Sequence, residues 1–139
     1  MLLLDTHVWI WSADGDTRRI GPRSRLLLLK AEAREAIRVS PVTLFELTAL
    51  HTSGRLRLSR ALEQWVGDSL EAAGVRIAEL TPSVAIDAGA IPRAALSDPL
   101  DRLLVSTARH LDAVFLTADR QILEYASETG NVRVHDASR

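Results

Sequence analysis

Short apolar runs alternate along this chain with segments whose apolar residues recur at helical spacing. The runs predict strands over Leu2–Asp5, Ile37–Ser40, Val75–Glu79, Val114–Thr117 and Val132–His135. The segments between them predict helices over Thr6–Ser12, Arg23–Glu35, Pro41–Thr52, Ser59–Ala73, Ser83–Ala90, Pro99–Leu111 and Asp119–Ser127. Strands that alternate with helices pair in parallel through right-handed crossovers. The pattern therefore predicts an α/β fold, with helices on both faces of a parallel sheet.

Local signals refine some of these helices. Ser40 is expected to cap the helix that Pro41 begins. Ser59 is expected to cap, and Gly74 to stop, the helix over Ser59–Ala73. The helix over Arg23–Glu35 carries three apolar residues on one side, namely Leu26, Leu29 and Ala33.

The size and composition of the chain limit its class. With 139 residues, 47% apolar and 25% charged, and without a linker, it is expected to form a single domain, residues 1–139. It contains no cysteine, which excludes disulfides and thiolate chemistry and fits a reducing cytoplasm. No run approaches the roughly 18 apolar residues of a membrane helix, so no membrane association is expected.

Two aspartates follow predicted strands directly. Asp5 ends the first apolar run, and Asp119 follows Val114–Thr117 after one residue. Ligands of open α/β sheets gather beyond the carboxyl ends of the strands, so both side chains are expected near one crevice. Each aspartate also suits the N-cap of the next helix. Capping and metal binding are compatible, and two such residues favour a site.

Glu46 lies on a helix with apolar neighbours, among them Val42, Phe45 and Leu47. An ionised carboxylate in apolar surroundings is costly unless a cation or hydrogen bonds compensate for it. No arginine stands at helical spacing from Glu46. This favours a role facing a metal ion.

Two further acids begin one helix, in Asp98-Pro99-Leu100-Asp101. The spacing resembles a capping box, with Asp98 as the cap. Asp101 falls at the edge of the buried stripe of the helix and has the stronger claim to a metal ion, with Asp98 as a possible further ligand. The sequence thus predicts that Asp5, Glu46, Asp101 and Asp119 together hold Mg²⁺ or Mn²⁺, which prefer oxygen ligands. Such clustered carboxylates repel one another, so one or more pKa values are expected to be high.

Other residue types receive structural interpretations. The remaining aspartates are assigned to turns or exposed faces: Asp14, Asp16, Asp68, Asp87, Asp112 and Asp136. The four histidines lack the spacing of a zinc site, and His7, although near Asp5, is assigned to packing or solvent. Three tryptophans, Trp9, Trp11 and Trp65, are assigned to the core or to a partner surface. Two arginine clusters suit either RNA phosphates or ordinary solvated surface: Arg18, Arg19, Arg23 and Arg25, and Arg55, Arg57 and Arg60.

The acidic segments together resemble the PIN-domain ribonucleases, and among these the VapC-type toxins of bacterial toxin–antitoxin pairs. The matching stretches are Leu3-Leu4-Asp5-Thr6-His7-Val8-Trp9, Ser40-Pro41-Val42-Thr43-Leu44-Phe45-Glu46-Leu47, Asp98-Pro99-Leu100-Asp101-Arg102-Leu103-Leu104 and Leu116-Thr117-Ala118-Asp119. Their order and spacing are more specific than any one of them. One departure is Leu96-Ser97, where many relatives carry a pair that contains histidine.

The resemblance implies a PIN-like three-layer α/β/α sandwich and a Mg²⁺- or Mn²⁺-dependent endoribonuclease. Carried onto this chain, the acidic quartet is Asp5, Glu46, Asp101 and Asp119, with Thr6 and Thr117 as accessory residues. The resemblance also implies a homodimer and a small antitoxin partner, with DNA contacted only through the antitoxin.

Two other functions are compatible with acids at strand ends. A phosphoacceptor receiver domain normally has a lysine near its site, whereas the only lysine here, Lys30, lies within a predicted helix. A non-catalytic PIN-like binding module would keep the fold without the chemistry. The hypothesis that best fits the acids is hydrolysis of an RNA phosphodiester by water that a bound cation activates.

Overall fold

The structure, a computed structural model, describes all 139 residues and has a five-stranded parallel sheet at its centre. The strands are β1 (Leu2–Leu4), β2 (Ile37–Val39), β3 (Val75–Ile77), β4 (Val114–Thr117) and β5 (Val134–Asp136), in the order β3-β2-β1-β4-β5. All four neighbouring pairs are parallel, and β1 lies in the middle, with Leu3 aligned with Arg38 of β2 and Phe115 of β4. All five strands predicted from the sequence are present.

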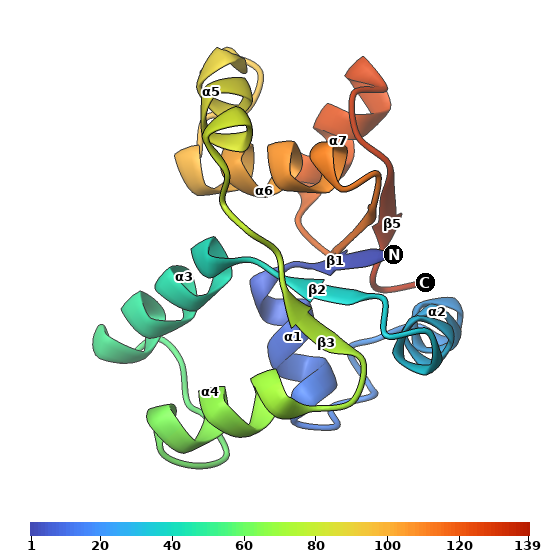
Figure 1. Ribbon diagram of the computed structural model, residues 1–139, viewed down its shortest axis with the longest axis vertical. Coiled ribbons are helices and arrows are strands. Elements are labelled where there is room, and N and C mark those ends of the chain that lie inside the picture. Colours follow the sequence, from blue (N-terminus) through green and yellow to red (C-terminus); the bar gives the residue numbers. More distant parts are fainter.

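Seven helices connect and cover the strands. They are α1 (Thr6–Ala13), α2 (Pro22–Ala33), α3 (Pro41–Thr52), α4 (Leu62–Glu71), α5 (Pro82–Ala90), α6 (Pro99–His110) and α7 (Arg120–Thr129). Figure 1 shows α5, α6 and α7 on one side of the sheet and α1, α2 and α4 on the other. The predicted α/β/α sandwich is therefore confirmed. No helix has the length and apolarity needed to cross a membrane.

Two apolar cores flank the sheet because side chains alternate along each strand. Leu2 and Leu4 point into one core together with Trp9, Leu47 and Trp65 of the helices. On the other face, Leu3 and Phe115 pack with residues of α6 and α7, among them Leu104, Val105, Ile122 and Tyr125. The central strands are thus buried on both faces, and their carboxyl ends are fixed rigidly.

Helix α3 begins as its sequence predicts. The Ser40 side chain accepts a hydrogen bond of 3.0 Å from the Val42 amide, and Pro41 occupies the first helical position. The helix over Pro41–Thr52 has the predicted bounds. It carries Glu46 toward α1 and α6, against which it packs.

The prediction for α4 was wrong at its start. The helix begins at Leu62 without a side-chain cap, because the Ser59 hydroxyl donates instead to Asp14, at 2.9 Å. The Trp65 indole N–H donates to the same Asp14 oxygen at 2.7 Å. Asp14 thus lies in an exposed turn, as expected, and also has a structural role there.

The apolar side expected for α2 is not the side that packs against the rest of the protein. Leu26 and Leu29 are 52% and 64% exposed, and the buried residues of this helix are Ser24, Leu28 and Ala31. The Ser24 hydroxyl donates to the Arg139 carbonyl at 2.8 Å, so the buried side of α2 meets the C-terminal residues. This polar contact selects a face of the helix that apolar spacing alone does not indicate.

Candidate active site

Asp5 stands where β1 passes into α1. Its amide donates to the Leu116 carbonyl at 3.0 Å, which continues the contact with β4 for one residue beyond the strand. One carboxylate oxygen then accepts from the Thr6 amide at 2.8 Å and caps α1. The other accepts from the Thr117 hydroxyl at 2.5 Å. Both oxygens of Asp5 are therefore oriented by the fold.

Asp119 occupies the corresponding place between β4 and α7. Its Oδ1 accepts from the Gln121 amide at 2.8 Å and caps the helix. Its own amide donates to the Thr117 hydroxyl oxygen at 3.0 Å. Thr117 is fully buried and connects the two strand ends, because it donates to Asp5 and accepts from Asp119.

Asp98 and Asp101 come from the start of α6. Asp98 accepts from the Leu100 amide at 2.8 Å, which confirms it as the helix cap. In a complete capping box the Asp101 carboxylate would accept from the Asp98 amide, but this carboxylate makes no hydrogen bond. Asp101 is instead only 7% exposed, so this acid is more deeply buried than a position at the edge of the apolar stripe implies.

Glu46 reaches the same region from α3 and is half-buried. The argument from apolar surroundings was wrong in part, since Phe45 is 64% exposed and Ala49 is also exposed. The absence of an arginine partner is confirmed, because Glu46 belongs to no ion pair. What distinguishes Glu46 is its direction, toward the other acids.

All five acids line one pocket of about 270 Å³. Its lining residues are Asp5, His7, Val8, Trp11, Glu46, Asp98, Asp101, Ala118 and Asp119. No lysine or arginine is among them, and none of the five acids takes part in an ion pair. The sequence-predicted acids are therefore brought together, and their charge is not compensated by a cationic side chain.

The pKa values of the acids reflect this concentration of charge. Burial raises the pKa of Asp101 to about 8, and the charges of Asp98, Asp119, Asp5 and Glu46 contribute in that order. Burial also raises the pKa of Asp5, although hydrogen bonds from Thr117 and Thr6 oppose the shift. At neutral pH the isolated pocket therefore retains a proton on Asp101. This agrees with the expectation that clustered carboxylates titrate high.

The donor set fits a hard divalent cation, because five carboxylates supply oxygen ligands and no cationic side chain competes for them. As the side chains stand, no three acidic or histidine residues are close enough together to enclose an ion. One oxygen of Asp5, Asp98 and Asp119 is engaged at a helix start. The other oxygens of Asp98 and Asp119, the Asp5 oxygen that accepts from Thr117, and the carboxylates of Glu46 and Asp101 are the ones that would hold an ion.

Two other members of the pocket were assigned elsewhere by sequence reasoning. His7 and Trp11 line the pocket, whereas His7 was assigned to packing or solvent and Trp11 to core or partner surface. The useful signal was their spacing, since residues four apart in a helix share a face. Thr6 behaves differently from the expected accessory residue. Its hydroxyl is buried without a hydrogen-bond partner, and Thr6 does not line the pocket.

Trp9 and Trp65 also do not serve as a partner surface. Trp9 is 2% exposed and Trp65 is fully buried, and their rings meet edge to face at 5.0 Å. Asp87 was wrongly assigned to an exposed position. It is half-buried between α5 and α6 and accepts from the Ser106 hydroxyl at 2.7 Å. These residues stabilise the fold and contribute nothing to the acidic pocket.

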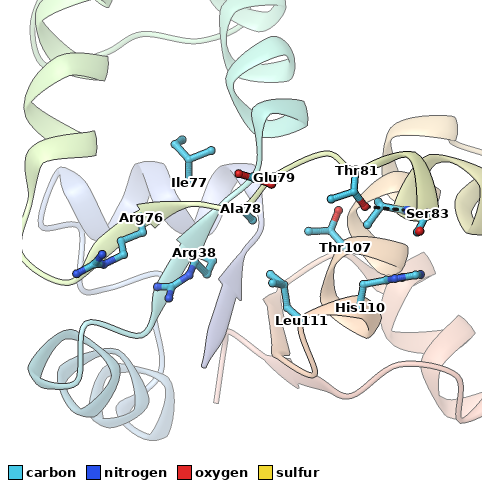
Figure 2. A pocket seen from close by; sticks show the side chains of 11 residues that line it. Arg38, Arg76, Ile77, Ala78, Glu79, Thr81, Ser83, Thr107, His110 and Leu111 are labelled. Atoms are coloured by element: carbon cyan, nitrogen blue, oxygen red, sulfur yellow. Dashed lines mark hydrogen bonds between the residues drawn. The ribbon is translucent and has the colours of Figure 1, made fainter.

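A larger cavity, of about 600 Å³, lies elsewhere on the molecule (Figure 2). Arg38 and Arg76 approach it from β2 and β3, and Thr107 and His110 approach it from α6. None of the five clustered acids lines it, and Glu79 is its only acidic residue. Size alone therefore does not identify the candidate site.

The fold is that of a known class. The PIN domain family model matches residues 2–128, and the chain belongs to the PIN domain family.

Among individual relatives, the chain is 31% identical over 121 residues to Ribonuclease VapC22 of Mycobacterium tuberculosis, covering 87% of this chain and 88% of that protein. Three solved structures share the fold. VapBC2 from Rickettsia felis, bound to a DNA fragment from its promoter, has a TM-score of 0.66 at 16% identity, over 97% of both chains. DNA-bound VapBC from Salmonella typhimurium has 0.63 at 21%, over 97% and 96%. VapBC-1 from nontypeable Haemophilus influenzae has 0.61 at 16%, over 99% and 98%.

Proposed function

We propose that this chain is a divalent-metal-dependent endoribonuclease that hydrolyses RNA phosphodiester bonds and acts as the toxin of a toxin–antitoxin pair. The observation that carries the proposal is the convergence of five carboxylates on one pocket without a cationic partner. Membership of the PIN domain family and the likeness to a VapC ribonuclease support the same activity. No observation favours a receiver domain, because Lys30 lies on α2 and does not line the pocket.

In this proposal Asp5, Glu46, Asp101 and Asp119 hold Mg²⁺ or Mn²⁺, directly or through its waters, and Asp98 is a possible further ligand. The bound ion would supply charge stabilisation for the phosphodiester in transit and activation of the attacking water. Thr117 fixes the orientation of Asp5, since its hydroxyl donates to Asp5 and is itself held by the Asp119 amide. Such outer hydrogen bonds keep a ligand in position. The proton on Asp101 must leave before this carboxylate serves as a ligand.

We further propose that residues 1–139 act as one cytoplasmic domain that forms a homodimer and is neutralised by a small antitoxin protein. The three VapBC structures that share the fold support a partner of this kind. Contact with DNA would occur only through the antitoxin.

The activity is tested by incubating the purified protein with mixed RNAs in Mn²⁺ or Mg²⁺, with and without chelator. Internal cleavage is expected only with metal. Asp5→Asn and Asp119→Asn should each lower the cleavage rate by at least roughly 100-fold, the upper end of the loss seen for weaker outer-shell changes at metal sites.

Asp68→Asn is the matched control. Asp68 is an exposed aspartate whose carboxylate pairs with Arg60 at 3.0 Å, away from the pocket, so its variant should cleave normally. Cleavage that persists in chelator, or an Asp5→Asn protein with undiminished activity, would show the proposal to be wrong.

A further inference from the structure

One wall of the acidic pocket is aromatic. His7 and Trp11 lie one turn apart on α1, and both line the pocket beside the acids. Their ring centroids are 6.0 Å apart, and the ring planes are inclined by 47°. His7 is exposed, and Trp11 is half-buried, with part of its ring against the core beneath. The pocket therefore presents two ring systems to whatever enters it.

The ring nitrogens of this wall are unused within the chain. The indole of Trp65 donates to Asp14, whereas neither the indole of Trp11 nor the imidazole of His7 makes a hydrogen bond within the chain. The Trp11 indole N–H is not a buried unpaired group, so it is open to water and can donate to a ligand.

A cation stands beside the same wall. The Arg19 guanidinium lies 5.5 Å from the Trp11 ring centroid, and its Nε pairs with Asp16 at 3.2 Å. The Arg19 side chain is 63% exposed. Arg19 forms no ion pair with the five acids of the pocket, so its charge remains outside their cluster. Trp11 thus adjoins both the acidic pocket, which it lines, and the guanidinium of Arg19, which lies over its ring.

This arrangement matches the parts of a nucleotide. Proteins bind unpaired bases by stacking them on tryptophan, histidine or arginine planes, and they hold phosphates with guanidinium groups. A base within a duplex is already stacked and does not offer its face to such a wall. The acids beside it cannot attract a phosphate without a cation, whereas the rings and Arg19 attract a nucleotide without one.

We propose that His7, Trp11 and Arg19 form a nucleobase subsite, in which an unpaired base next to the scissile phosphodiester stacks on Trp11 and His7. Arg19 contacts an adjacent phosphate. The inference rests on the proposed ribonuclease function, whose acids it places next to the stacked base.

Binding is measured separately from cleavage by using the Asp5→Asn protein in Mn²⁺ and single-stranded RNA octamers. Stacking on Trp11 should quench tryptophan fluorescence, because Trp9 and Trp65 are buried and not accessible to a base. Trp11→Leu in the Asp5→Asn background should weaken octamer binding by roughly 5- to 150-fold, the range that corresponds to loss of one stacked base. Trp11→Phe should restore most of the affinity, since it restores an aromatic face.

Two controls separate stacking from folding and from charge. Arg19→Gln changes an exposed side chain, so the protein should fold normally, bind the octamer more weakly and show a smaller dependence of affinity on salt. An octamer with one abasic position at the cleavage site should bind wild-type and Trp11→Leu proteins equally. If Trp11→Leu weakens both octamers to the same degree, the residue is structural and the subsite is absent.

Cleavage distinguishes this inference from the function on which it rests. Absence of metal-dependent RNA cleavage by the wild-type protein would remove the proposed function. If the wild-type protein cleaves and Trp11→Leu and Trp11→Phe cleave equally well, the nuclease stands and the subsite falls. If Trp11→Leu leaves RNA binding intact and weakens only capture of a protein partner, the wall is a protein-docking surface and the inference is wrong.

Discussion

At the scale of single residues, the free-energy cost of gathering five acids is clearest at Asp101. It is 7% exposed, makes no hydrogen bond and has a pKa raised from 3.8 to about 8. A buried acid that lacks a partner is neutral when it can be, because an unpaired buried charge is expensive. Asp101 thus lowers the stability of the metal-free protein when it is ionised, and it is a candidate ligand when an ion is present.

The sign of the resulting pH dependence follows from the direction of the shift. The folded protein binds the Asp101 proton more tightly than the unfolded chain does, so the contribution to stability is complete below about pH 4 and is lost as the pH rises through about 8. The Asp101→Asn variant has no titrating group at this position, so its stability should not fall in this way as the pH rises. In chelator at pH 8 the variant should be more stable than the wild type by several kcal/mol, since the shift spans about four pKa units and one unit corresponds to about 1.4 kcal/mol.

Urea unfolding at several pH values measures this difference. The curves of wild-type and Asp101→Asn proteins should approach each other at pH 4 and separate toward pH 8, while Asp68→Asn follows the wild type. Parallel wild-type and Asp101→Asn curves would mean that Asp101 is ionised freely in the folded protein.

At the scale of elements, the sequence predicts best where local chemistry decides. The start of α3 is set by Ser40 and Pro41, which act within their own turn, and both were identified. The start of α4 is set by a contact between Ser59 and Asp14, 45 residues apart, which no local pattern contains. In α2 a run of four leucines gives no distinct apolar side. The buried face is instead the one on which Ser24 donates a hydrogen bond to Arg139, at the C-terminus.

Substitution of two glycines, Gly67 and Gly74, tests what fixes the junction between α4 and β3. Gly74 has a φ of +77°, and a Cβ there would lie 2.7 Å from the backbone of Glu32, whereas a Cβ on Gly67 within α4 would meet nothing within 4 Å. Gly74→Ala should therefore destabilise the fold by more than about 1 kcal/mol, and Gly67→Ala should stabilise it by up to about 1 kcal/mol.

Thermal unfolding of the two alanine variants provides the comparison, with the wild type between them. Equal midpoints for both variants would show that the junction between α4 and β3 tolerates a side chain and that its geometry is set elsewhere.

At the scale of the whole molecule, convergence of the acids was predictable, and their detailed arrangement was not. The carboxyl ends of β1 and β4 had to meet because parallel strands share an edge, which placed Asp5 and Asp119 together. The burial of Asp101, the hydroxyl bridge of Thr117 and the aromatic wall at His7 and Trp11 depend on how α1, α3 and α6 pack. The spacing of His7 and Trp11 shows only that they share a face of α1, and which elements that face meets is a property of the assembled fold.

Metal binding should stabilise the entire fold if the pocket is a cation site. Saturation at 100 times the dissociation constant adds about 2.7 kcal/mol to the free energy of unfolding, because only the folded state binds. Mn²⁺ should therefore raise the melting temperature of the wild-type and Asp68→Asn proteins alike. A double variant, Asp5→Asn with Asp119→Asn, should show little rise, and an undiminished rise would place the ion outside this pocket.

The helix caps at the pocket have a consequence for how such a chain can change. Asp5, Asp98 and Asp119 each use one oxygen to begin a helix, and asparagine carries an oxygen of the same reach. At Asp98 and Asp119, exchange of the second oxygen for nitrogen removes a charge that the proposed metal site needs and a repulsion that opposes folding, whereas at Asp5 it also removes the acceptor of the Thr117 hydroxyl. An inactive descendant with a stable fold is thus a single substitution away at Asp98 or Asp119, and its folded domain remains available for another function.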